Sequence, residues 1–187
     1  MGYTTIGEVL SHVAKNNRLV VQLLIDGSVP DLSRMDDVRS QPLDGREVFI
    51  ETAPPLAIAR EVLVAVDETM VTAETLREQA AEAFRVGDAP GGLGKLSGCF
   101  ATWHNAQDSL AKVARLLRVD LGELKTEDGR TVAAVMSRFA ENLRTLRDAL
   151  EARDYVLCCD VLTYDMAELR GEFKLATAAL HDAASAR

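Results

Sequence analysis

The amino-acid sequence predicts an α+β protein in which helix predominates. We expect a small N-terminal β-hairpin with a short helix, followed by an antiparallel bundle of about four helices. Strand-like segments end near residue 53, where the chain changes character. Beyond that point apolar residues recur at spacings of three and four, which is the period of an amphipathic helix. The connections there are short, as between antiparallel neighbours in a bundle.

The predicted organisation is one folded domain with a small appendage. The chain has 187 residues, of which 48% are hydrophobic and 27% are charged, an ordinary globular balance. We expect residues 1–53 to form an αββ element that packs on the bundle and residues 54–182 to form the bundle. Residues 183–187 are Ala-rich and are expected to form a frayed tail.

The first predicted element is a short amphipathic helix. Thr5 and Glu8 match a capping box, and apolar residues follow at helical spacing, namely Ile6, Val9, Leu10 and Val13. Asn16 and Asn17 are expected to end this helix.

Two strands are expected next. Residues 18–27, RLVVQLLIDG, contain adjacent valines and end at an Asp-Gly turn. Residues 46–52, REVFIET, alternate apolar and acidic side chains, which is typical of a half-exposed strand. The polar stretch between them leaves room for one helical turn. We expect the strands to pair antiparallel and helices to cover one face, because an isolated two-stranded sheet is only marginally stable.

Helices account for most of the remaining chain. Residues 55–86 form either one long helix or two helices that meet near Thr69–Thr72. Residues 87–94, GDAPGGLG, are predicted to be a linker. Helices are then expected at 95–117, at 132–150 and from residue 155 onward, with a break at 119–129 and Asp154 as the last N-cap. The last helix carries a regular apolar stripe: Tyr155, Cys159, Leu162, Met166, Leu169, Phe173, Ala176 and Leu180.

Phosphate and nucleic-acid chemistry is disfavoured. The net charge is −8, and the basic residues are scattered among acids, whereas nucleic-acid binding needs clustered Lys and Arg. Gly94-Lys95 resembles the end of a phosphate-binding loop. However, Ala89 replaces the first glycine of that motif and Leu96 replaces its Ser/Thr.

The cysteines are the most suggestive candidates for chemistry. Cys158 and Cys159 are adjacent, and Cys99 and His104 could complete a zinc site in principle. Neighbouring residues of a helix diverge by about 100°, so the pair cannot both reach one ion or form an unstrained disulfide. We therefore expect Cys159 in the apolar stripe and Cys158 on another face, both as packing residues. A thiol sensor remains the alternative.

The remaining titratable groups fit ordinary structural roles. His12, His104 and His181 lack the spacing of metal ligands. His104 follows Trp103 and is expected at the boundary of the core. Asp165, Glu168 and Glu172 share one helical face and are expected to form a solvated stripe. We thus predict no catalytic, cofactor-binding or metal-ligating residues, and no cofactor.

The N-terminal segment carries no signal-peptide pattern. No stretch approaches the roughly 20 apolar residues that span a bilayer, and three cysteines do not make an extracellular disulfide framework. We expect a cytoplasmic protein without membrane insertion.

The segment ALEARDYVLCCDVLTYDM, residues 149–166, resembles the C-terminal hairpin of uncharacterised small acidic helical bacterial proteins associated with motility gene neighbourhoods. The matching residues are Asp154, Val156, Asp160, Leu162, Tyr164 and Asp165. The resemblance implies an adaptor or accessory role and carries no catalytic residue.

The functional prediction is a non-enzymatic, cytoplasmic protein-binding protein: an adaptor, chaperone or assembly factor. Its surface would be a groove between bundle helices or the exposed edge of the β-hairpin, which could add a partner strand. The alternative is a thiol- or metal-responsive regulator that uses Cys158 and Cys159. A protein partner is expected and nucleic acid is not; self-association through a helix seam is left open.

Overall fold

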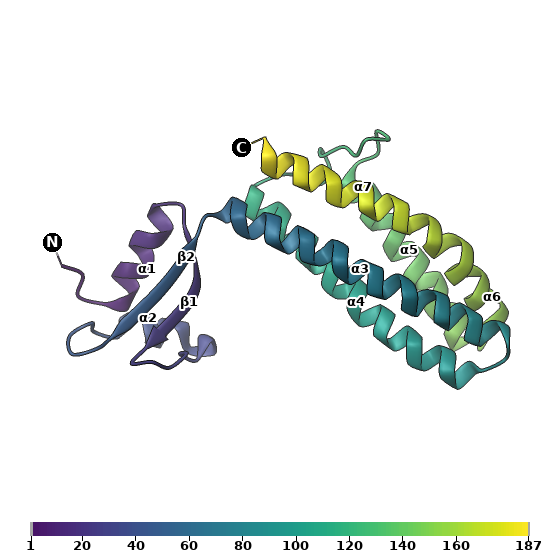
Figure 1. Cartoon of the computed structure of the whole chain (residues 1–187), viewed down its shortest axis with the longest axis horizontal. Coiled ribbons are helices and arrows are strands. Elements are labelled where there is room, and N and C mark those ends of the chain that lie inside the picture. The colour runs from purple at the N-terminus through teal and green to yellow at the C-terminus, as the bar shows by residue number, and fades with distance from the viewer. Residues whose placement is uncertain (1, 187) are drawn as a thin grey trace. The chain divides into compact units, whose positions relative to one another are not determined.

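The computed structural model describes residues 2–186, which divide into two compact units between Ile58 and Ala59. Most of the chain is helical, and the N-terminal unit carries a two-stranded antiparallel sheet (Figure 1). The predicted class, α+β with helix predominant, is therefore confirmed. The expectation that residues 1–53 pack on the bundle stays a prediction.

The N-terminal unit contains α1 (Ile6–Lys15), β1 (Leu19–Ile25), a 3₁₀ turn η1 (Leu32–Arg34), α2 (Met35–Ser40) and β2 (Val48–Ala53). The Thr5 hydroxyl caps α1 by accepting the amide of Glu8 at 3.3 Å. The Glu8 carboxylate in turn accepts the amide of Thr4 at 2.7 Å. The capping residues thus start the helix where the sequence predicts it.

The two strands pair antiparallel, as predicted. Leu23 lies opposite Ile50 and Ile25 lies opposite Val48, and a bulge interrupts the register between Val20 and Gln22. One face of the sheet is covered by the two short helices, since a single cluster of buried residues joins them to the sheet, namely Ile6, Leu23, Ile25 and Val38.

The second unit begins with a helical hairpin of α3 (Pro55–Arg85) and α4 (Ala89–Leu117) (Figure 1). Residues 55–85 are one helix. The predicted linker at 87–94 is wrong, because α4 already begins at Ala89. Asp88 caps it by accepting the amide of Gly91 at 3.0 Å. Gly92 is buried against the Phe84 ring, where a Cβ would lie 2.6 Å from Cε1. The glycine therefore permits close helix packing and does not mark a loop.

Three further helices follow: α5 (Val132–Glu151), α6 (Tyr155–Asp160) and α7 (Met166–Ser185), the last two joined by a π-helical turn η2 (Val161–Asp165). Asp154 caps α6 by accepting the Leu157 amide at 2.9 Å. The π-turn splits the single last helix of the prediction, so the helix count differs in detail.

The predicted frayed tail is also wrong for residues 183–186. Helix α7 continues to Ser185, and Ala184 is fully buried. The guanidinium of Arg60 donates to the Ala184 carbonyl at 3.2 Å. A packed alanine face and a capped carbonyl hold this end in place; residue 187 lies outside the described residues.

Aromatic rings fill the centre of the helical unit. Trp103 meets Phe139 edge-on with ring centroids 5.8 Å apart, and Phe139 meets Phe173 at 6.0 Å. The predicted stripe of the last helix is buried from Leu162 to Leu180. Its first members, Tyr155 and Cys159, are only partly buried.

Candidate functional site

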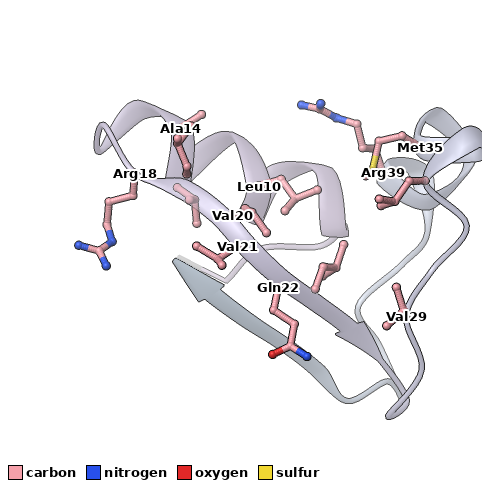
Figure 2. Close-up of a pocket in the computed structure, with 13 residues that line it drawn as sticks. Leu10, Ala14, Arg18, Val20, Val21, Gln22, Val29, Met35 and Arg39 are labelled. Atoms are coloured by element: carbon pink, nitrogen blue, oxygen red, sulfur yellow. The ribbon is translucent and has the colours of Figure 1, made fainter. Parts of the chain in front are cut away.

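The largest cavity in the described part of the N-terminal unit is a groove of about 630 Å³ along β1 (Figure 2). We call it the β1 groove. Helix α1, strand β1, the segment after it and α2 all contribute to its walls: Leu10, Val13, Ala14, Arg18, Leu19, Val20, Val21, Gln22, Leu23, Val29, Leu32, Met35 and Arg39. This volume falls within the range of small-ligand and peptide pockets.

The floor of the β1 groove reaches the core of the unit. Leu23 belongs to the buried cluster, and Leu10 and Met35 pack against that cluster. Apolar side chains at the mouth stay exposed: Val21 is 54% exposed and Val29 is 69% exposed. The groove is therefore a continuous apolar surface from the core to solvent, which is the kind of surface that marks an interaction site.

One edge of β1 is unpaired along the β1 groove. In the described part of the chain β1 pairs only with β2, on its other side. Near its end, Ile25 and Ser28 exchange both backbone hydrogen bonds across a tight turn, with N···O distances of 2.9 and 3.0 Å. Ser28 thus already occupies the place of a third strand beside Ile25. From Leu19 to Leu24 the same place is open, and an open edge presents free N–H and C=O groups.

The charge of the β1 groove differs from that of the whole chain. The net charge of the protein is −8, yet the lining includes Arg18 and Arg39 and neither Asp nor Glu. Arg18 donates to the hydroxyl and carbonyl of Thr52, at 2.7 and 2.6 Å, and meets no carboxylate. Arg39 is exposed, and its side chain has no hydrogen-bond or ion-pair partner in the described part of the N-terminal unit. Figure 2 shows the two arginines on opposite sides of the apolar lining.

The sequence predicted an exposed hairpin edge as one of two candidate surfaces, and the strands themselves signalled it. The rest of the groove escaped sequence reasoning. Val29, Leu32 and Arg39 lie in the polar stretch between the strands, and only the folded chain brings them beside α1.

The structure reverses the prediction for the adjacent cysteines. Cys158 is fully buried, whereas Cys159 is partly exposed. The physical reason is the π-turn η2, since a π-turn contains one residue more than an α-helical turn. The extra residue rotates the preceding helix relative to α7, so that Cys158 takes the core position expected for Cys159. Val161, predicted on the face away from the core, is buried as well.

The chemical surroundings of the thiols differ accordingly. Burial raises the pKa of Cys99 to about 12, and burial also raises the pKa of Cys158, with Asp154 adding to the effect. Both thiols are thus poor nucleophiles. Cys159 lies with Arg77, Arg85 and Thr163 around a pocket of about 370 Å³, and its thiol contacts the Ala81 carbonyl at 3.5 Å. Within residues 2–186 no three His, Cys, Asp or Glu side chains are grouped to hold a metal ion.

The predicted solvated acidic stripe is wrong for Glu172. This residue is 5% exposed and its carboxylate pairs with both Arg130 and Arg138. Arg138 also binds Glu168 at 2.6 Å. Arg130 reaches Glu172 from the loop between α4 and α5, so sequence separation hid the partner that allows this carboxylate to be buried.

The Trp103-His104 pair separates into a core residue and a surface residue. Trp103 is 3% exposed, whereas His104 is on the solvent side of α4. His104 was expected at the core boundary and lies farther out. The structure brings neither a carboxylate nor another histidine together with it in a described metal group.

Sequence reasoning also missed the buried Arg77. Its guanidinium donates to the Leu162 carbonyl in the π-turn and pairs with Glu74 at 2.5 Å. A π-turn frees carbonyls that an α-helix would satisfy internally, so Arg77 compensates for the irregular backbone. The signal available in the sequence, an Arg three residues after a Glu on a helix, is too common to have identified it.

The residues that carry the bacterial-protein resemblance serve different purposes. Asp154 is the N-cap of α6 and Leu162 is fully buried, so both are structural. Val156 and Tyr164 are 75% and 68% exposed, and Asp160 lies on the same exposed helix. They form a small apolar surface of their own on the helical unit.

No protein-family model, curated protein or solved structure matches this chain in comparisons with each. The suggested relation to motility-associated bacterial proteins therefore stays a prediction. Across residues 2–186 every helix is too short or too polar to cross a lipid bilayer.

Proposed function

We propose that this protein is a non-enzymatic, cytoplasmic protein-binding protein, an adaptor, chaperone or assembly factor, and that the β1 groove is its binding surface. The observation that carries the proposal is the coincidence of an open strand edge with an apolar groove. An edge supplies backbone hydrogen bonds to an incoming strand, and adjacent apolar pockets select its side chains. Between the two surfaces named from the sequence, this observation favours the hairpin edge over a groove between bundle helices.

The proposal is tested with the full-length protein as bait in extracts of its source organism. Val21→Glu places a charge at the mouth of the β1 groove. Val71→Glu makes the same change on the exposed surface of α3, where Val71 is 57% exposed. A partner protein that binds the wild type and Val71→Glu but is lost with Val21→Glu supports the proposal. Partners that ignore both changes would contradict it, as would turnover of small molecules that depends on Cys159 or a histidine.

A second candidate, a thiol-responsive regulator, is favoured by the surroundings of Cys159. This thiol is partly exposed, and it lies beside Arg85, whose charge would favour a thiolate. Labelling with a small thiol reagent should then modify Cys159 in the folded protein, with Cys159→Ser as the control. If label enters only after unfolding, this second candidate fails. The cysteine pair itself offers no shared site, since Cys158 faces the core.

A further inference from the structure

The β1 groove has a chemical character that identifies the kind of segment it receives. We propose that its partner is an extended peptide strand with apolar side chains at alternate positions and a carboxylate near each end, added to β1 beside Ser28. This inference rests on the proposed function and names the chemistry of the partner.

The length of the open edge sets the length of the segment. Beside β1, only Leu19–Leu24 is free, because the Ser28 turn occupies the place next to Ile25. A strand advances about 3.3 Å per residue, so the edge takes a segment of about five residues between the two ends. Successive side chains of a strand alternate in direction, which makes every second residue enter the groove and calls for apolar residues there.

Arg18 and Arg39 set the charge of the two ends. Arg18 precedes the first residue of β1, whereas Arg39 lies on α2 beside the other end of the groove (Figure 2). Neither guanidinium pairs with a carboxylate in the described part of the unit. Carboxylates are the matching partners, because a guanidinium presents a planar fork of donors that fits them.

Two other occupants fit the same surface less well. A fatty acid would satisfy the apolar lining and one arginine, but it has no groups to bond the open backbone edge. A second copy of this chain would bring the strand LVVQLLI, preceded by Asn16, Asn17 and Arg18. That flank brings a third positive charge to the groove and leaves one arginine without an acid. The peptide alone answers the backbone, the lining and both charges.

The test measures fluorescence anisotropy of a labelled, end-capped peptide, Asp-Val-Thr-Val-Thr-Val-Asp, with the full-length protein. Asn at both ends should weaken binding by about fivefold to thirtyfold, as expected when two exposed charge contacts are lost. Raising the salt concentration should shrink this difference. Methylation of the central peptide nitrogens should abolish binding, because it removes the ladder donors of the added strand.

Arg39→Glu provides the reciprocal change and is suited to it, because Arg39 is exposed and holds no structural partner. It should weaken the Asp-ended peptide about tenfold, and replacing one terminal Asp by Lys should restore most of the loss. Lys15→Glu changes the net charge equally and lies on α1 outside the groove lining. It should alter binding less than about twofold.

The failures can be told apart. Equal binding of Asp-ended and Asn-ended peptides overturns the charge assignment and leaves the proposed function intact. Displacement by dodecanoate without any effect of nitrogen methylation identifies a fatty-acid site and overturns the peptide. A dimer in light scattering that Val21→Glu dissociates assigns the groove to a second copy. If no peptide binds while a Val21-dependent protein partner is captured, the strand chemistry is wrong; if that partner is also missing, the proposed function is wrong.

Discussion

Replacing Gly92 by alanine should destabilise the protein although the change improves helix propensity. A Cβ at this position would lie 2.6, 2.8 and 2.9 Å from three carbons of the Phe84 ring. These distances are far inside contact, so a ring or a helix must move. The ring is 5% exposed and stacks on Tyr155, with centroids 5.4 Å apart, which leaves it little freedom to move.

The magnitude follows from two opposing terms. Alanine in place of glycine inside a helix contributes about 1 kcal/mol of stability. Forcing an extra methyl group into a packed core costs about 1–3 kcal/mol, and more where backbone must shift. With the contact this close we expect the upper part of that range, so Gly92→Ala should lower the free energy of unfolding by about 1–2 kcal/mol.

Gly94 in the same helix is the matched control. It is exposed, and nothing lies within 4 Å of a Cβ built there. Gly94→Ala should therefore stabilise the protein by up to about 1 kcal/mol. The two variants are compared by urea unfolding, followed by helical circular dichroism and by the fluorescence of Trp103, the single tryptophan.

The refuting result is equal stabilisation by the two alanines. A second cycle isolates the cause: in a Phe84→Leu background the ring is gone, and Gly92→Ala should no longer be unfavourable. If its cost persists there, the steric explanation is wrong even though the sign was predicted correctly.

Three further predictions concern buried or paired side chains. Cys158→Ala should lower the free energy of unfolding by about 1–2 kcal/mol and Cys159→Ala by less, because only Cys158 is fully buried; the reverse order in urea unfolding would place the π-turn elsewhere. Arg77→Leu should cost about 3–5 kcal/mol by leaving the Glu74 carboxylate unpaired, and adding Glu74→Leu should recover much of the loss if the charge is responsible. Hydrogen bonds from Arg130 and Thr126 hold the pKa of Asp128 below its ordinary value near 3.8. Its contribution is therefore present above that pH and lost as pH falls toward the lowered pKa, so the wild type and Asp128→Asn should differ at pH 7 and converge in acid.

Local rules identified most elements of this protein. Capping residues such as Thr5 and Asp154 bond to amides two or three residues away, so the sequence alone places those helix starts. The strands were recognisable for the same reason, since alternation along a few residues reports which face is buried. Leu162 to Leu180 follow one apolar period and are buried throughout.

Where local rules failed, a distant partner was responsible. Gly92 looked like part of a linker because nothing nearby shows that the Phe84 ring lies against it. Glu172 looked solvated because Arg130 arrives from a loop some forty residues earlier in the chain, which only its close pairing with Arg138 and Arg130 reveals. Glycines and acids signal loops and surfaces on average, and tertiary contacts decide the individual case.

The sequence by itself determined the fold class, the strand pair and the apolar stripe, because these depend on periodicity and on contacts between near neighbours. Tertiary structure alone decided the phase of the cysteine helix, through one extra residue in the π-turn, and the existence of the β1 groove. That groove joins Leu10, Val21 and Arg39 from three separate elements. Its apolar lining and its two free guanidinium groups arise only when the turn at Asp26-Gly27 and the segment after it fold back beside α1, and no spacing rule along the chain describes that approach.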